Sequence, residues 1–232
     1  MPTPVKISAK VEKIIDHGEK TYSVFLVPQK RLPRFKPGQF LHLALDDYDP
    51  SRHWPDSRVF SIASPPKEIP IRITYSVVGK FTERLEKELI LGKNVWLKMP
   101  YGDFIIKENC ENVLVAGGTG ITAFTAILTD DRKSFEKPIS LLYGAKTPDL
   151  LIYKEVIKSN IKSKYFAEKI SNNVSEVELG KLSCEEIYKS AQNPKEAFFY
   201  FSGPPQMLKC FTEEMHGKFG VEKENLIIDA WE

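Results

Sequence analysis

The stretch VLVAGGTGITAF, residues Val113 to Phe124, is an apolar segment that runs directly into a glycine-rich turn. An uninterrupted apolar run of this kind is typical of a strand buried on both faces of a parallel sheet. Glycines let the backbone approach a ligand closely, and the N-terminus of the following helix offers free N–H groups to a phosphate. The turn is therefore either a phosphate cradle or a tight structural turn.

The spacing Gly118-x-Gly120-x-x-Ala123 fits the loose form of the dinucleotide-binding fingerprint. The full fingerprint also has an acidic residue about 20 positions further on, at the end of the second strand, where it holds a ribose. Here the second apolar segment ends in LLYGAK, residues 141–146, without an acid at its tip. A simple domain with a resident NAD is therefore not favoured.

Around this turn, strand-like and helix-like segments alternate from about residue 111 to the end of the chain. This order predicts a parallel sheet with helices on both faces. Ser183 followed by Glu186 is the pattern of a helix N-cap. The expected strands are 112–116, 138–144, 163–171, 197–203 and 225–231, and the expected helices follow the turn and span 149–160, 183–192 and 204–219.

A second glycine turn, YFSGPPQM at residues 200–207, again joins a strand to a helix, which its prolines open. Two such turns in one parallel sheet lie at its carboxyl edge, where ligands bind.

The first 106 residues have a different pattern, with many short β-rich segments separated by proline and glycine. Expected strands are 5–14, 21–27, 40–45, 59–64, 71–78 and 94–99, with one helix at 81–90. This arrangement predicts a small antiparallel six-stranded β-barrel. We expect one domain over residues 1–106 and an α/β domain over 107–232.

Composition excludes several classes of protein. There are 33 basic and 31 acidic residues, so the net charge of +2 gives no reason to expect nucleic-acid binding. Three widely spaced cysteines without a C-x-x-C argue against a disulfide framework and against a metal or iron–sulfur site. The sequence has no signal peptide and no stretch near the about 18 apolar residues of a membrane span. We expect a cytoplasmic monomer.

The segment RVFS, residues 58–61, places a cation, an aromatic ring and a hydroxyl on one strand. Because side chains alternate along a strand, Arg58 and Phe60 share one face and Ser61 lies on the other. A flavin needs such groups, namely a cation for phosphate, a flat apolar wall and a hydrogen-bonding partner near its reactive nitrogen. Taken alone, the segment is better explained as an edge strand with a surface arginine.

Together these motifs resemble the ferredoxin–NADP reductase superfamily of two-domain flavin reductases. The resemblance covers nearly the whole chain and includes KPGQF (36–40), RVFS (58–61), GKFT (79–82), GGTGIT (117–122), LLYGAKTPDLL (141–151) and SGPPQM (202–207). It implies an FAD-binding barrel followed by an α/β domain that docks NAD(P)H, so that hydride passes to the flavin. FMN is the less expected flavin.

The resemblance also implies the roles of individual residues. Ser61 is expected near the reactive nitrogen of the flavin, and Trp231 near the C-terminus either covers the flavin or closes the sheet edge. The flavin-binding residues implied are Arg58, Val59, Phe60, Ser61, Thr74, Tyr75, Gly79, Lys80, Phe81, Thr82 and Trp231. The nucleotide-binding residues implied are Gly118, Thr119, Gly120, Ile121, Thr122, Tyr143, Gly144, Ser171, Ser202, Gly203, Pro204 and Met207.

Departures from the family pattern qualify this expectation. Phe60 stands where the family has tyrosine, as in members that use flavin as a loosely held substrate, and Ser202 stands where cysteine is frequent. Ser171-Asn172-Asn173 offers no arginine for a 2′-phosphate, which favours NADH, although Lys169 and Lys181 lie nearby.

The expected activity is electron transfer from NAD(P)H through FAD to a separate ferredoxin, flavodoxin or oxygenase component. The alternatives are a free-flavin reductase and a non-catalytic or electron-transfer subunit of a larger redox complex.

Overall fold

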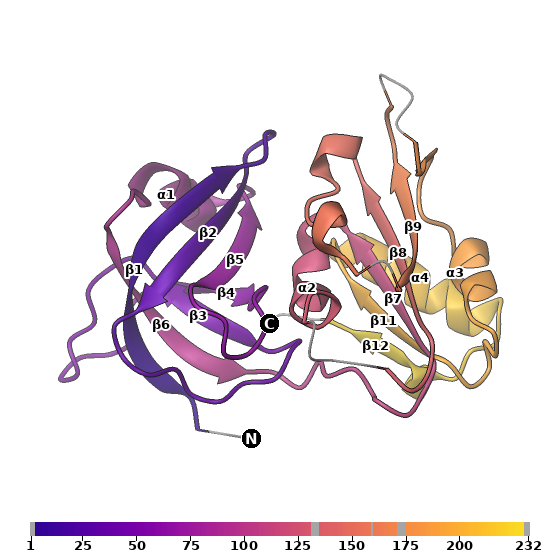
Figure 1. Cartoon of the computed structure of the whole chain (residues 1–232), viewed down its shortest axis with the longest axis horizontal. Helices are drawn as coiled ribbons and strands as arrows, with labels where there is room; N and C mark the ends of the chain where they lie inside the picture. The colour runs from indigo at the N-terminus through magenta and orange to yellow at the C-terminus, as the bar shows by residue number, and fades with distance from the viewer. Residues whose placement is uncertain (1–2, 131–134, 159, 171–174, 230–232) are drawn as a thin grey trace. The chain divides into compact units, whose positions relative to one another are not determined.

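A computed structural model of the chain describes residues 3–130, 135–158, 160–170 and 175–229 (Figure 1). The chain divides into two compact units, one of residues 1–105 with 125–127 and one of residues 106–124 with 128–232. Each unit is built on one six-stranded sheet.

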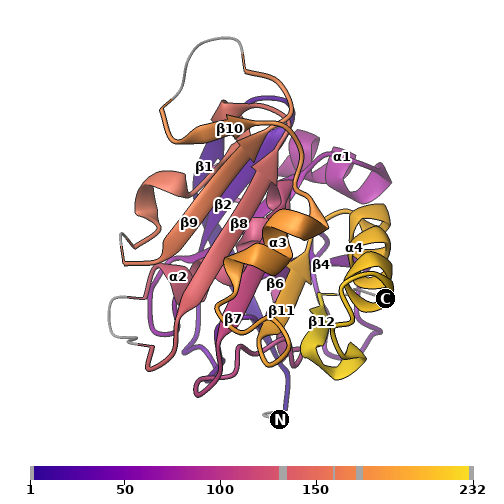
Figure 2. The same cartoon turned by 90° about the vertical axis from the view of Figure 1, so that its right-hand side faces the viewer.

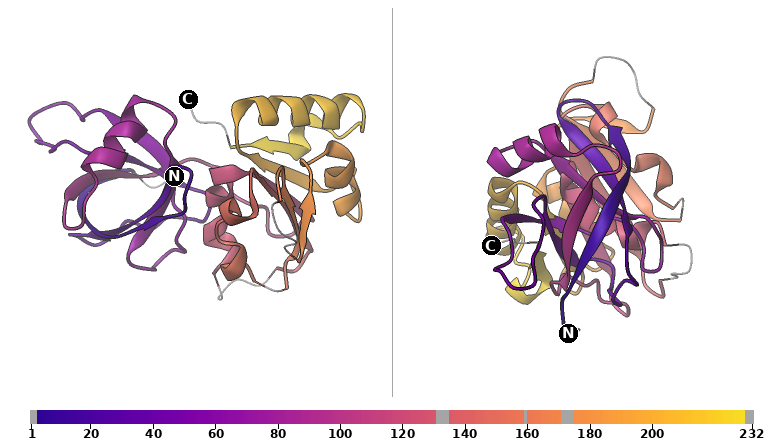
Figure 3. Two further views of the ribbon diagram at one scale, coloured as in Figure 1. Left: turned by 90° about the horizontal axis from the view of Figure 1, so that it is seen from above. Right: turned by 90° about the vertical axis from the view of Figure 1, so that its left-hand side faces the viewer.

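The first unit is an antiparallel barrel with strand order β4-β3-β6-β1-β2-β5. Figure 3 shows these strands from above as they curve around the interior. Between β5 and β6 lies the helix α1. The strands are β1 (Val5–Asp16), β2 (Thr21–Pro28), β3 (Phe40–Ala44), β4 (Ser57–Ser61), β5 (Ile71–Ser76) and β6 (Asn94–Tyr101), and the helix is α1 (Lys80–Glu88).

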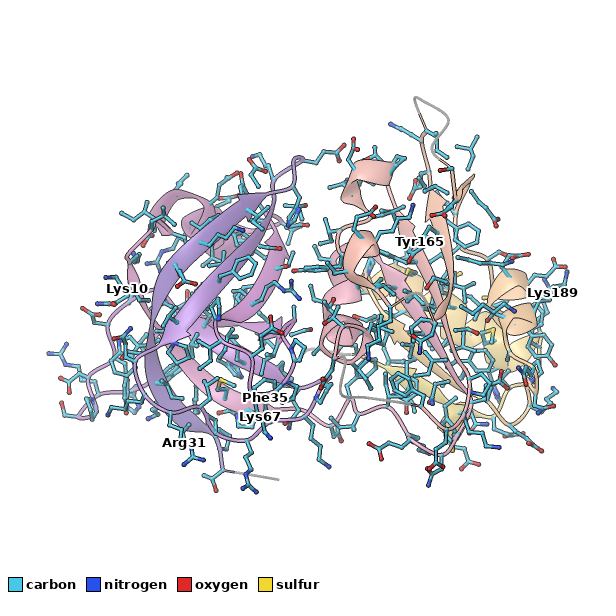
Figure 4. All side chains as sticks on the ribbon, viewed as in Figure 1. Lys10, Arg31, Phe35, Lys67, Tyr165 and Lys189 are labelled. Atoms are coloured by element: carbon cyan, nitrogen blue, oxygen red, sulfur yellow. The ribbon has the colours of Figure 1, made fainter. Side chains whose placement is uncertain are left out.

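Alternate residues of the barrel strands form one apolar core, which is the reason that the period-two pattern selects this fold. Leu41 and Leu43 of β3 and Val95 and Leu97 of β6 are fully buried in it. Phe35, in the segment before β3 and labelled in Figure 4, packs against the same core. The expected six-stranded antiparallel barrel is confirmed.

The second unit is a parallel sheet with strand order β10-β9-β8-β7-β11-β12. β7 is buried along its whole length and lies at the centre between β8 and β11, as its continuous apolar sequence predicts. The strands are β7 (Asn112–Gly117), β8 (Ile139–Ala145), β9 (Lys162–Ala167), β10 (Val177–Leu179), β11 (Phe198–Ser202) and β12 (Leu226–Ile228).

Helices lie on both faces of this sheet, as expected. α3 (Cys184–Ser190) and α4 (Pro205–Gly217) cover one face, where their buried side chains pack on β7 and β11 (Figure 2). α2 (Thr122–Leu128) lies on the other face (Figure 1). Ser183 caps α3, because its Oγ accepts a hydrogen bond from the Glu186 N–H at 3.2 Å.

One expectation about secondary structure is wrong, and one short strand was missed. The helix expected at 149–160 is replaced by two single turns of 3₁₀ helix, η2 (Pro148–Leu150) and η3 (Lys154–Val156). Between them Tyr153 adopts a left-handed conformation with φ of 70°, which interrupts a right-handed helix. The short edge strand β10 was not expected, because its three residues carry too little pattern to be recognised.

Candidate functional site

The first group of predicted site residues lies at the seam between β4 and β5, the two edge strands of the barrel sheet. Just beyond β4, the Ala63 N–H donates to the Arg72 carbonyl of β5 at 2.8 Å. On the core side the rings of Phe60 and Tyr75 pack with their centroids 6.2 Å apart. These two contacts bring the end of β4 beside β5, although the two strands are not hydrogen-bonded neighbours in the sheet.

Ser61 and Ala63 lie on one side of their extended segment, and Arg72 and Thr74 lie on one side of β5, so the Ala63–Arg72 hydrogen bond puts Ser61 and Thr74 on the same side of this seam. Both side chains are buried, with 8% and 5% of their surface exposed. Ser61 makes no side-chain hydrogen bond with any residue that the structure describes, so its hydroxyl is available to a ligand. The structure thus brings together two residues that the sequence separates.

Arg58 and Phe60 point to the same side of β4, because they pair with Leu43 and Leu41 of β3. Phe60 is buried in the barrel core, whereas Arg58 is exposed. Within the described chain the guanidinium of Arg58 has no acidic partner and no hydrogen bond. An unpaired arginine at the rim of the barrel is suited to an anionic group such as a phosphate. Val59, between them, is half-buried.

The start of α1 holds a further set of predicted residues. Thr82 Oγ1 accepts hydrogen bonds from the N–H groups of Val78 at 2.9 Å and Gly79 at 3.1 Å. The N–H groups of Lys80 and Phe81, in the first turn, have no intrahelical acceptor and remain for a ligand. Thr82 is therefore a capping residue, and Phe81 anchors the helix in the core.

The glycines of the turn after β7 have two roles, access of a ligand to the backbone and close packing. Gly118 has φ of +53° and open space around it, so its backbone can approach a ligand. A Cβ on Gly120 would lie 2.2 Å from the Ser202 carbonyl oxygen, and one on Gly117 would lie 2.6 Å from the Met207 sulfur. Gly120 is thus needed for close packing against backbone, whereas a side chain at Gly117 would meet first the flexible end of Met207. Close packing is the structural explanation of this turn.

Between β7 and α2 the turn forms a short 3₁₀ helix, η1 (Gly118–Ile121), rather than entering α2 directly. Thr122 closes it, because its Oγ1 donates to the Thr119 carbonyl at 2.8 Å. Ile121 is fully buried. Of the five predicted residues here, Gly118, Thr119 and Gly120 are partly exposed, and Ile121 and Thr122 are buried.

The second glycine turn packs directly against the first. Gly203 has φ of +156°, and a Cβ there would lie 3.2 Å from the Gly117 Cα. Pro204 precedes α4, and Pro205 occupies its first turn, where proline is favoured. Both turns are therefore at the carboxyl edge of the sheet, as the sequence predicts.

Sequence reasoning missed Asp229, which follows β12 and is 5% exposed. Its Oδ2 accepts a hydrogen bond from Ser202 Oγ at 2.8 Å. Burial raises the pKa of the Asp229 carboxyl to about 7, and the hydrogen bond from Ser202 lowers this pKa by a smaller amount. The available signal was an acid directly after the last strand, at the same sheet edge as Ser202.

A second missed feature lies on the barrel. His17 Nε2 and Ser23 Oγ are 2.8 Å apart, and Ser23 Oγ and Thr74 Oγ1 are 2.7 Å apart. Desolvation lowers the pKa of the half-buried His17, with a smaller opposing effect of Asp16. Nothing in the sequence indicates this chain of bonds, because it joins residues up to 57 positions apart.

Other predicted residues lie apart from these groups or outside the described chain. Tyr143 is fully buried in β8, where its hydroxyl donates to the Leu150 carbonyl at 3.0 Å. Gly144 faces the side chain of Leu182. Ser171 and Trp231 lie outside the described residues.

Among the described residues no cluster of metal-ligating side chains is found. In the same part of the chain no helix has the length and apolar character that crossing a bilayer requires.

Comparisons with known proteins give a family match within the second unit. Residues 114–213 match the family described as oxidoreductase NAD-binding domain. The chain is 26% identical to the propane 2-monooxygenase reductase component of Rhodococcus jostii over 212 residues, 85% of this chain and 55% of that protein. It is 29% identical to the NAD(P)H-flavin reductase of Aliivibrio fischeri over 164 residues, 66% of each chain. The chain spans about half the length of the curated relatives that it matches.

A solved ferredoxin reductase in carbazole 1,9a-dioxygenase has the same fold, with a TM-score of 0.81 and 21% identity. The alignment covers 99% of this chain and 70% of that one. Residues 114–213 are thus similar to an oxidoreductase NAD-binding domain, and the chain as a whole shares its two-unit fold with solved ferredoxin reductases.

Proposed function

We propose that this chain takes hydride from NAD(P)H onto FAD and passes the electrons to a separate acceptor protein. In this proposal residues 1–106 form the FAD-binding domain and residues 107–232 the NAD(P)-binding domain. Cytoplasmic location and a monomeric state belong to the same proposal.

The observation that carries the proposal is the seam between β4 and β5. There the Arg58 guanidinium and the Ser61 hydroxyl have no side-chain partner among the described residues, and Ser61 lies on the same side of the seam as Thr74. A cation for the pyrophosphate and a hydroxyl for the ring system are what FAD requires of a protein. The first-turn N–H groups of α1 supply a second anion-binding element in the same unit.

In the second unit the two packed glycine turns support nucleotide binding. Gly118 leaves the backbone of the turn open, and the short helices that follow point their N–H groups toward the carboxyl edge. Ser202 and Asp229 add a hydroxyl and a carboxyl at this edge. No ribose-binding acid follows β8, which suits a nucleotide that binds as a substrate and leaves after the reaction.

When bound, FAD supplies the redox chemistry, accepting a hydride and returning electrons singly or in pairs. The protein's contribution is to bind and orient both nucleotides and to exclude water from the reacting rings. The relatives named above include an oxygenase reductase component, which supports a protein acceptor of the ferredoxin, flavodoxin or oxygenase type. NADH is the proposed donor, because Ser171-Asn172-Asn173 has no arginine for a 2′-phosphate.

A second candidate function is reduction of free flavin. It is favoured by Phe60, which has no hydroxyl and packs into the barrel core, and by the similarity to a NAD(P)H-flavin reductase. The two functions differ in how tightly the barrel holds flavin.

The absorbance spectrum of the purified protein tests the proposal. We expect a yellow protein with about one FAD per chain. Anaerobic mixing with NADH should bleach the flavin absorbance faster than mixing with NADPH. A colourless protein that reduces added flavin would support the second candidate, and a flavin-loaded protein that neither nucleotide bleaches would refute both.

A further inference from the structure

The outer face of β2 and β5 carries a row of hydroxyl groups, of which only Thr74 is among the residues expected to bind flavin. Ser23 of β2 is paired with Thr74 of β5, and their hydroxyl oxygens are 2.7 Å apart. His17, in the turn before β2, places Nε2 2.8 Å from the same Ser23 oxygen. The three side chains therefore form a continuous hydrogen-bonded chain.

This chain leads to the proposed flavin site at one end and toward solvent at the other. Thr74 is two residues from Arg72, whose carbonyl accepts the hydrogen bond from the Ala63 N–H, two residues after Ser61. Ser23 and Thr74 are 1% and 5% exposed. His17 is half-buried, in a turn whose neighbours Asp16 and Gly18 are exposed. A buried start and an accessible end are the features of a path that moves a proton.

The proposed reaction produces a proton that must leave the flavin site. A hydride carries two electrons and one proton, so when acceptors later remove two electrons from the reduced flavin, one proton remains to be released. We propose that Thr74, Ser23 and His17 form a relay that carries this proton from the flavin site to solvent, an inference that rests on the proposed function.

The chemistry of the three groups suits this task. A hydroxyl accepts one hydrogen bond while donating another, so Thr74 and Ser23 can pass a proton along without moving. The neutral imidazole of His17 accepts a proton at Nε2, and burial keeps its pKa below the ordinary value so that the neutral form dominates near pH 7.

The charged groups around His17 do not block this role. In the turn that holds His17, the charge of Asp16 raises the His17 pKa, but burial lowers this pKa by more. Glu19 and Lys20 follow in the same turn. β5 lies beside β2, and its residue near His17 is the neutral Ser76. The one charged residue of β5, Arg72, lies further along the strand, opposite Phe25.

The experiment uses flavin-loaded protein reduced with dithionite and mixed with ferricyanide, which accepts single electrons and no protons. Ser23→Ala interrupts the chain, and we expect flavin reoxidation to slow about tenfold or more. The matched control is Ser76→Ala, which removes a hydroxyl from the neighbouring pair Thr21–Ser76, 2.9 Å apart on the same two strands. The control should reoxidise at the wild-type rate.

Two further measurements separate a relay from a structural role. His17→Gln should lose the pH dependence of the reoxidation rate, and added imidazole should restore the rate. In the flavin-free protein, Thr74→Val should shift the His17 ring signals in nitrogen NMR, because a continuous chain of hydrogen bonds is polarised along its length. Unchanged His17 signals would show that the chain is not continuous and overturn the relay.

The outcomes distinguish the relay from the function on which it rests. Wild-type rates in Ser23→Ala, with full flavin content, would overturn the relay and leave the proposed reductase intact. Equal slowing in Ser23→Ala and Ser76→Ala would mean a general disturbance of the sheet and would also overturn it. A wild-type protein that retains no flavin would overturn both proposals.

Discussion

Replacing Asp229 with asparagine should stabilise the protein by an amount that grows with pH. The carboxyl is 5% exposed, accepts one hydrogen bond from Ser202 and has its pKa raised to about 7 from 3.8. The folded state therefore binds its proton more tightly than the unfolded state does. Between these two pKa values the folded state holds more protons, so stability falls as the pH rises and levels off above about pH 7.

The size of the effect follows from the two pKa values. At about 1.4 kcal/mol per pKa unit, ionising this buried carboxyl costs about 4 kcal/mol at about pH 8 and about 2 kcal/mol at about pH 5. Asparagine has nearly the same shape and no charge, so it avoids this cost at every pH. The stability difference between Asp229→Asn and wild type should therefore increase by about 2–3 kcal/mol from about pH 5 to about pH 8.

Urea denaturation followed by circular dichroism at a series of pH values measures this difference. Other titrating groups cancel, because both proteins contain them. Ser202→Ala is the companion variant: it removes the hydrogen bond that favours the ionised carboxyl, so the pH midpoint of the effect should move upward. Parallel stability curves for wild type and Asp229→Asn across this range would show that the carboxyl keeps an ordinary pKa, and would refute the reasoning.

Three further changes test the two units. Arg58→Ala should weaken FAD binding about tenfold, because it removes the exposed cation proposed to bind phosphate. Titrating flavin-free protein with FAD measures this affinity, and an unchanged affinity would place the phosphate elsewhere. Gly120→Ala should destabilise the protein by about 2 kcal/mol or more, because the new Cβ would lie 2.2 Å from the backbone oxygen of Ser202. The control Gly217→Ala has open space around it and should not destabilise the protein, so equal denaturation midpoints for the two variants would contradict the packing. Thr82→Val should lower the free energy of unfolding by about 1 kcal/mol, because it removes the acceptor for two N–H groups at the start of α1. A stability equal to wild type would show that water replaces the Thr82 hydroxyl as acceptor.

Much of the fold was accessible from local patterns. Period-two alternation in the first hundred residues predicts the barrel, and the continuous apolar run Val113–Ala116 predicts the central parallel strand. The helix expected at 149–160 failed because Leu151 and Ile152 are buried at successive positions and Tyr153 turns left-handed, features that tertiary packing imposes.

By itself the sequence determined the two kinds of sheet, their order along the chain and the glycine turns at the carboxyl edge. These depend on residue type and spacing within a few positions, which local sterics and side-chain periodicity govern. Only the tertiary structure decided that Gly120 packs against Ser202, that Ser202 binds Asp229, and that His17 reaches Thr74 through Ser23. Such contacts depend on strand register and burial, which join residues that the sequence keeps far apart.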